Sequence, residues 1–212
     1  MAERLPYDTV LREATAEFSE KKSRFISYLA PASSEEEAKA FTAGLRARYP
    51  DATHHVTAWV LRRDNTLRFS DDGEPSGTAG KPALEVLTRE GLQDVALVVV
   101  RYFGGTLLGA GGLTRAYARA AKLAVEAADR VRMVTGVAFC LRADYAVWPR
   151  ISRALPEFSV AQTGLDFGAE VVFTGVAESE RFAPLCDHLR ELSAGAVLPE
   201  ITGEEWIPIP IK

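Results

Sequence analysis

The first part of the chain shows the periodicity of strands and then that of a helix. Residues 9–18 are predicted to form a strand, alternating polar and apolar residues predict a second strand over 24–30, and the charged turn between them favours a hairpin. From Ala38 to Tyr49 the apolar residues recur at three- and four-residue spacing, which is typical of an amphipathic helix. Ser33 and Ser34 supply capping residues before this helix, and Pro50 ends it.

The middle of the chain continues with strands, glycine-rich turns and helices. In order, the pattern predicts two strands, a polar loop, a short helix, an apolar strand and a long helix, over residues 54–61, 66–70, 71–81, 82–90, 95–100 and 113–128. The apolar strand has no polar residue, which indicates a strand covered on both faces of its sheet. Proline opens the short helix, as is common at a first helical position.

The last 80 residues have a different texture and predict a second domain. The expected order is β-α-β-β-α-β, with elements over residues 134–145, 148–155, 159–164, 169–174, 178–192 and 196–202, and an extended proline-rich tail at 207–211. This order is the ferredoxin-like plan. The sequence therefore predicts an α+β protein with one domain at residues 1–132 and a ferredoxin-like domain at residues 133–212.

Composition and charge limit the possible partners. Apolar residues make up 47% of the chain and charged residues 25%, as in a packed globular protein. Residues 1–132 carry 19 basic and 18 acidic side chains, whereas residues 133–212 carry 6 and 11, so a polyanion would meet the first domain more readily. The N-terminus has no signal-peptide pattern and no apolar run could cross a bilayer, which predicts a cytoplasmic protein without membrane contact.

The loop from Ser70 to Pro82 is the first stretch that could carry chemistry. Its glycines free the backbone, and Ser76, Thr78 and Lys81 could face an anion, while Asp71, Asp72 and Glu74 could hold magnesium. It is no P-loop, because Pro75 stands where the first glycine belongs and Pro82 follows the lysine. A polar surface turn remains the alternative interpretation.

The second stretch, residues 101–117, joins the apolar strand to the long helix through a loop rich in glycine. A strand, a glycine loop and a helix N-terminus in this order suit anion binding, because free amides and the helix dipole point at the loop. The dinucleotide fingerprint fails, since Thr114 stands where the third glycine should be. Arg101 at the strand end and Arg115 in the helix favour a polar site over simple close packing.

The two adjacent histidines and a basic turn are smaller candidates. His54 and His55 could act in acid–base chemistry, but neighbouring strand residues point to opposite faces and cannot easily share a site. Lys22 and Arg24 flank a hairpin tip that is either a phosphate contact or a solvated turn.

These separated segments together resemble the YigZ/IMPACT family. The matching residues run in the same order over about residues 20–120: Lys22 to Phe25, His54-His55 with Trp59, Ser70 to Gly80, Val98 to Gly105, Leu108-Gly109, Gly111 to Leu113 and Arg115 to Tyr117. The resemblance implies a first domain like domain 2 of ribosomal protein S5 and domain IV of elongation factor G. It implies a second domain like domain V of that factor.

The resemblance also implies a role near translation. Eukaryotic IMPACT proteins act in translational control by competing for a regulator of an initiation-factor kinase, through an additional N-terminal domain, so that specific role is not carried over. Bacterial members have been suspected of binding nucleic acid on the strength of their fold. No established reaction comes with the family, and fold alone does not imply function.

The first hypothesis is therefore a non-catalytic protein that binds RNA, the ribosome or a translation factor and regulates translation, without a cofactor. Tyr102 or Tyr117 could stack on a base. The residues expected to contact phosphate or nucleic acid are Lys22, Arg24, His54, Ser76, Thr78, Lys81, Arg101, Tyr102, Gly104, Gly105, Gly109, Gly111, Gly112, Arg115 and Arg119. The alternatives are a magnesium-dependent enzyme or sensor for a small phosphorylated metabolite, with Asp71, Asp72 and Glu74 as metal ligands, and a pure protein-interaction module.

Overall fold

The structure is a computed structural model that describes residues 5–63 and 65–211. It divides the chain into two compact units, one of residues 7–132 with the last residues, the other of residues 133–209 with the first residues. The extreme ends of the two expected domains, residues 1–4 and 212, lie outside the described residues. Each unit is described by itself.

The first unit contains a five-stranded sheet in which each neighbouring pair is antiparallel. The strand order is β2-β3-β6-β4-β5. The bounds are β2 Ala14–Glu20, β3 Ser23–Pro31, β4 His54–Leu61, β5 Thr66–Ser70 and β6 Val95–Tyr102. As expected from its apolar run, β6 lies in the middle of the sheet, with Val95 to Arg101 buried.

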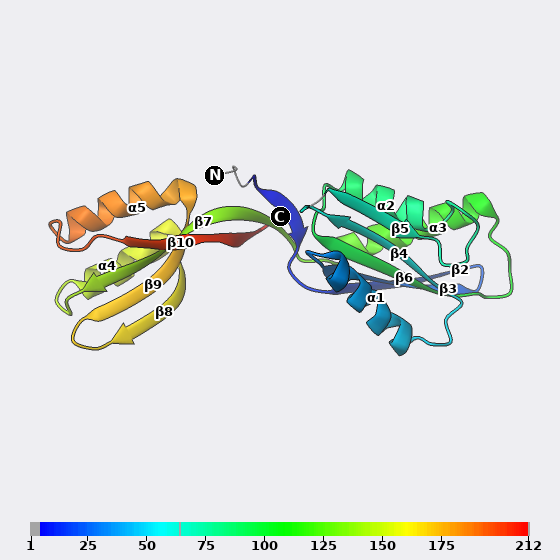
Figure 1. Ribbon diagram of the computed structural model, residues 1–212, viewed down its shortest axis with the longest axis horizontal. Helices are drawn as coiled ribbons and strands as arrows, with labels where there is room; N and C mark the ends of the chain where they lie inside the picture. Colours follow the sequence, from blue (N-terminus) through cyan, green and yellow to red (C-terminus); the bar gives the residue numbers. More distant parts are fainter. Residues whose placement is uncertain (1–4, 64, 212) are drawn as a thin grey trace. The chain divides into compact units, whose positions relative to one another are not determined.

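Helices cover both faces of this sheet (Figure 1). They are α1 (Glu35–Arg48), α2 (Gly80–Arg89) and α3 (Ala110–Glu126). On β6, Leu97 and Val99 pack with α2 and α3, whereas Val98 and Val100 pack with Leu45 of α1. Because alternate strand residues face opposite sides, α1 lies on one face and α2 with α3 on the other.

Two sequence-based boundaries in this unit are wrong. The single strand expected over residues 9–18 is two strands, β1 (Tyr7–Val10) and β2. Between them the amide of Leu11 donates to the carbonyl of Asp129, and Arg12 pairs with the Asp129 carboxylate. Helix α3 begins at Ala110, three residues before its expected start, and so includes two of the glycines assigned to the loop.

The second unit has the expected β-α-β-β-α-β order. Its elements are β7 (Arg130–Ala143), α4 (Trp148–Ala154), β8 (Ala161–Phe167), β9 (Val171–Glu178), α5 (Ser179–Leu192) and β10 (Glu200–Pro210). Strands β7, β9 and β8 pair in that order, antiparallel, and β10 pairs with β7. Helices packed on antiparallel sheets in both units confirm the expected α+β class.

The core of the second unit joins its strands to α5, and its last strand differs from expectation. Phe139 and Phe173 pack against Leu185 and Leu189. The strand expected at residues 196–202 begins only at Glu200, and it continues through most of the expected tail as one strand, β10, that ends at Pro210. Prolines fit there because a proline in an edge strand need not donate a ladder hydrogen bond. In the described part of the chain, no helix has both the length and the apolar character needed to span a membrane.

Candidate functional site

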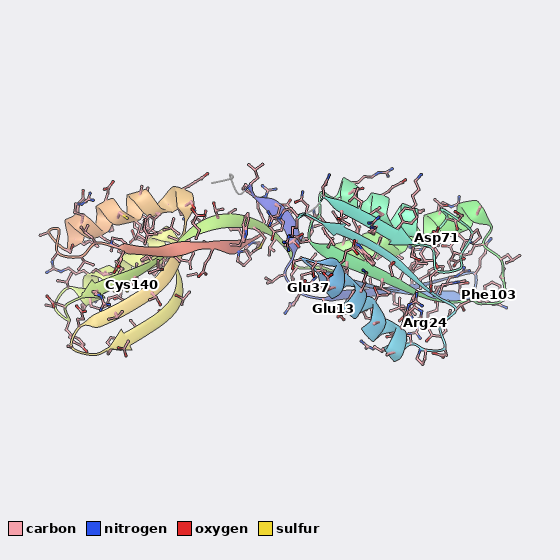
Figure 2. All side chains as sticks on the ribbon, in the orientation of Figure 1. Glu13, Arg24, Glu37, Asp71, Phe103 and Cys140 are labelled. Carbon is pink, nitrogen blue, oxygen red and sulfur yellow. The ribbon has the colours of Figure 1, made fainter. Side chains whose placement is uncertain are left out.

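Asp71 organises the loop between β5 and α2. Its Oδ2 accepts a hydrogen bond from the amide of Gly77 at 2.8 Å, and its Oδ1 accepts from the amides of Ala79 at 3.1 Å and Gly80 at 2.8 Å. The carboxylate therefore satisfies amides at the start of α2, where the helix dipole favours a negative charge. Figure 2 shows Asp71 at the same end of the unit as Arg24 and Phe103.

Asp72 points away from its neighbour and ties the loop to α1. Its Oδ1 accepts from Arg46 at 2.5 Å, and its Oδ2 accepts from the backbone amide of His55 at 2.6 Å. Burial by itself raises the pKa of Asp72, but the bonds from Arg46 and His55 outweigh it and hold the pKa below its ordinary value.

Glu74 is the buried centre of the site, with its side chain only 4% exposed. Its Oε1 accepts hydrogen bonds from the guanidinium of Arg101 and, at 2.7 Å, from the hydroxyl of Tyr117. Burial first, and the contact with Glu74 second, raise the pKa of Tyr117. One carboxylate thus joins the loop after β5 to the end of β6 and to α3, on both sides of the second glycine loop.

Arg101 extends this network to the β2–β3 hairpin. Its second terminal nitrogen donates to Ser23 Oγ at 3.2 Å, and the same oxygen accepts from the amide of Gly104 at 3.2 Å. The guanidinium also lies over the rings of Phe25 and Phe103, 5.3 and 5.6 Å from their centroids. Arg101 is 4% exposed, so its charge faces protein partners instead of the phosphate expected from the sequence.

The two histidines lie on opposite faces of β4, as expected. His54 Nδ1 is 2.7 Å from the carbonyl oxygen of Asp72 and donates to it, because a carbonyl only accepts. Its Nε2 is 3.7 Å from Glu74 Oε1. His55 is buried on the α1 face of the sheet, away from Glu74.

The expected metal ligands do not converge. Asp71, Asp72 and Glu74 each hold different protein donors, as described above. Across residues 5–63 and 65–211, no cluster of three or more His, Cys, Asp or Glu side chains is placed to hold a metal ion.

Three of the expected cationic residues remain at the surface without an ionic or hydrogen-bonding partner. Of the residues the structure describes, Lys22, Lys81 and Arg115 are exposed and unpaired. Arg24 instead pairs with Glu17 at 2.7 and 2.8 Å, and the Arg119 guanidinium lies 4.6 Å from the ring centroid of Phe18. The structure therefore separates the expected basic residues into free and occupied groups.

The glycine loop after β6 is held close to Lys22. A Cβ on Gly104 would overlap the backbone of Lys22 and Ser23, so only glycine fits this approach. Gly105 and Gly109 have φ values of 78° and 72°, which also favour glycine. Helix α3 begins after Gly109 with no side-chain cap and no acidic residue in its first turn, and Gly111 is exposed there while Gly112 is buried.

The remaining residues that were expected to contact RNA are two tyrosines and two residues of the loop between β5 and α2. Tyr102 packs on the α1 face, is only partly buried and donates to Asp51 at 3.0 Å. Tyr117 is fully buried, so its ring is not available to stack on a base. Thr78 donates to the carbonyl of Pro75 at 2.7 Å and so closes the loop, and Ser76 is exposed.

Sequence reasoning missed Ser23, Arg46 and Phe103. Ser23 and Arg46 contact residues far away in the sequence, and no local pattern reveals such pairing. Phe103 is an aromatic residue beside a glycine loop and is 44% exposed, so it places an exposed aromatic ring at this surface.

Stability is expected to decrease on mild acidification because of His55. Burial first, and Arg46 second, hold the pKa of His55 below its ordinary value of 6.5. The unfolded chain takes up a proton at this ring that the folded chain resists. The contribution of the neutral His55 ring to the stability of the folded chain is therefore complete above pH 6.5. It is lost as the pH falls through 6.5 toward the folded-state pKa.

Urea unfolding of the wild type and of His55→Gln at about pH 7.5 and pH 5.5 measures this contribution. The midpoint should fall less with pH in His55→Gln than in the wild type. Equal falls in both proteins would contradict the assignment to His55, because the other titratable groups are common to the two.

Comparison with known proteins places this geometry in a family. The Impact N-terminal domain model matches residues 21–125, which contain Ser23, Glu74, Arg101 and Tyr117. The chain is 38% identical over 180 residues to "IMPACT family member YigZ" of Escherichia coli (strain K12), covering 84% of this chain and 88% of that protein. It is 35% identical over 190 residues to "IMPACT family member YvyE" of Bacillus subtilis (strain 168), covering 89% and 88%.

A solved structure agrees over nearly the whole length. "Crystal structure of an hypothetical protein" is 36% identical in sequence and has a TM-score of 0.60, covering 92% of this chain and 96% of its own. The sequence matches cover both units, and the family model covers the network around Glu74. The chain belongs to the IMPACT family.

Proposed function

We propose that the first domain binds RNA through the exposed surface around the two glycine loops, and that the protein acts without catalysis in the control of translation in the cytoplasm. The observation that carries the proposal is the set of exposed, unpaired cations Lys22, Lys81 and Arg115 beside these loops. Cations that are not neutralised by the protein can neutralise phosphates and release counterions.

The buried network gives this surface a fixed shape. Glu74, Arg101 and Ser23 hold the loop after β5, the end of β6 and the β2–β3 hairpin together. A groove or surface that is already ordered loses less conformational entropy when RNA binds. Arg101 therefore supports the proposal as a positioning residue and not as a phosphate contact.

The second glycine loop supplies groups of two further kinds. The first amides of α3 have no capping side chain, and the helix dipole favours an anion at this end of the helix. The exposed ring of Phe103 offers a platform on which an unpaired base can stack. Contacts of the helix amides with phosphate fix the position of the RNA and do not read its sequence.

Family membership supports the proposed role in translational control. The resemblance to eukaryotic IMPACT proteins points to translational control, and we extend the proposal to fold: the first domain is like domain 2 of ribosomal protein S5 and domain IV of elongation factor G. The second domain is ferredoxin-like, like domain V of that factor. We do not extend the proposal to a magnesium-dependent reaction, because Asp71, Asp72 and Glu74 already hold protein donors.

Binding to a fluorescent ribosomal RNA fragment across a salt series tests the proposal. The variant Lys22→Ala/Lys81→Ala/Arg115→Ala should bind about tenfold to a hundredfold more weakly at low salt, with a salt slope smaller by about 2. The matched control Arg63→Ala/Arg150→Ala/Arg153→Ala removes three exposed arginines elsewhere and the same net charge.

Two results would reject the RNA surface. One is no binding by the wild type even at low salt, which would leave the protein-interaction module as the working hypothesis. The other is an equal loss in the control variant, which would show that only total charge matters.

A further inference from the structure

A cavity lies on the other face of the sheet, between α1 and β4. Its volume is about 210 Å³. It is lined by Lys39, Thr42, Ala43, Arg46, Thr57 and Trp59. None of the residues expected from the sequence to contact phosphate lines it, so it is separate from the proposed RNA surface.

Trp59 contributes a buried hydrogen-bond donor that has no partner. The indole packs against Ala32, Ala38 and Ala96 under α1, and its Nε1 is buried without an acceptor. Burial of an unsatisfied donor is unfavourable, and such groups in native proteins call for an explanation. A ligand acceptor that reaches the indole N–H would remove this cost.

Two cations and two hydroxyl groups also line the cavity. The cations belong to Lys39 and Arg46, and the hydroxyl groups to Thr57 and to Thr42, which already donates to the carbonyl of Ala38 at 2.8 Å. No carboxylate lines the cavity: Glu35 and Asp72, which pair with Lys39 at 2.9 Å and with Arg46 at 2.5 Å, are outside its lining. An anion therefore binds these two cations in competition with Glu35 and Asp72.

The two cationic side chains that line the cavity can move. The side chains of Lys39 and Arg46 are 63% and 47% exposed, so each can change rotamer at little cost in packing. The volume is below that of pockets for drug-sized ligands, which begin at roughly 300 Å³. It suits an oxyanion group with few attached atoms.

We propose that this cavity binds the oxyanion group, a phosphate or a carboxylate, of a small molecule, through the indole N–H of Trp59 and the cations of Lys39 and Arg46.

An oxyanion bound at this site affects the loop between β5 and α2 through Arg46. An oxyanion that binds Arg46 competes with Asp72, whose carboxylate also accepts from the amide of His55 and whose carbonyl accepts from His54. Binding in the cavity therefore alters the loop that carries Glu74. The RNA surface and the cavity are separate proposals, and either can stand without the other.

The indole N–H resonance of Trp59 in a proton–nitrogen NMR spectrum provides a direct test on the full chain. Inorganic phosphate and, in a second series, acetate are titrated at constant ionic strength against chloride. The Trp59 resonance, assigned by its loss in Trp59→Phe, should shift in a saturable way with at least one of the two anions. The His55 amide should shift with it, while the indoles of Trp148 and Trp206 serve as internal references.

Variants then connect the shift to the cations. Lys39→Gln and Arg46→Gln should each weaken the apparent affinity by about tenfold, as expected for loss of one charge-assisted hydrogen bond. Lys122→Gln, an exposed lysine of α3 that is also paired with a glutamate, should leave it unchanged. Saturation with phosphate alone or acetate alone identifies the anion class. Absence of saturation with both, or an undiminished affinity in both cavity variants, overturns the proposal.

Discussion

Replacement of Glu74 by alanine is expected to lower the free energy of unfolding by about 3–5 kcal/mol, the cost of breaking a buried ion pair by removing one partner. The variant leaves the guanidinium of Arg101 buried without its counter-charge and the hydroxyl of Tyr117 without its acceptor. Chemical denaturation followed by circular dichroism measures the change. The change should exceed that for Asp72→Ala, because the Asp72 side chain is 23% exposed and that of Glu74 is 4% exposed.

The control is Glu85→Ala, which removes a half-exposed carboxylate of α2 that is 3.8 Å from Arg89. Exposed pairs contribute roughly 0–1 kcal/mol, so little change is expected there. The double variant Glu74→Leu/Arg101→Met, which removes both charges, should recover part of the stability lost in Glu74→Ala. If Glu74→Ala is no more destabilising than Glu85→Ala, the buried network does not hold the loops together.

Replacement of Gly104 by alanine is expected to destabilise the first domain by about 1–3 kcal/mol and to weaken RNA binding. The new methyl group would overlap the backbone of Lys22 and Ser23, and backbone cannot rotate away as a side chain can. The hairpin or the glycine loop must move, which also lengthens the bond from the Gly104 amide to Ser23. Urea unfolding and the RNA titration measure the two effects.

Gly111→Ala is the control, because this replacement should not lower the stability. Gly111 lies in the first turn of α3, where an added Cβ comes no closer than 3.6 Å to an Arg115 side-chain nitrogen. Alanine in a helix is favoured over glycine by up to about 1 kcal/mol, so this variant should be as stable as the wild type or more so. A similar loss in both variants would mean that any side chain near the loop is harmful, and not only one at the contact with Lys22.

Periodicity predicted most of the elements, and its errors have local causes. The apolar run of β6 and the three- and four-residue spacing of α1 are strong signals, and both elements are present. The break after Val10 escaped prediction because it depends on Asp129, which is more than 110 residues further along the chain. The early start of α3 escaped because glycine is a poor helix former, and its place in the first turn is decided by packing.

The sequence identified the region of the candidate site more successfully than the role of each residue. Glycine loops and the charge at the end of β6 pointed to residues 71–115, and the network around Glu74 lies there. The roles differ because burial decides them. Arg101 and Tyr117 read as surface groups for RNA but are buried, whereas Lys22, Lys81 and Arg115 are exposed and unpaired.

By itself the sequence therefore determined the α+β class, the order of most elements and the family, because these follow from local patterns of side chains and from short motifs. Only the tertiary structure decided which charges are neutralised: that Glu74 binds Arg101, that Asp71 holds the start of α2, and that Arg46 holds Asp72. The physical reason is that an ion pair depends on distance and burial in space. Residues 26 or 27 positions apart meet only when the sheet and its loops have formed.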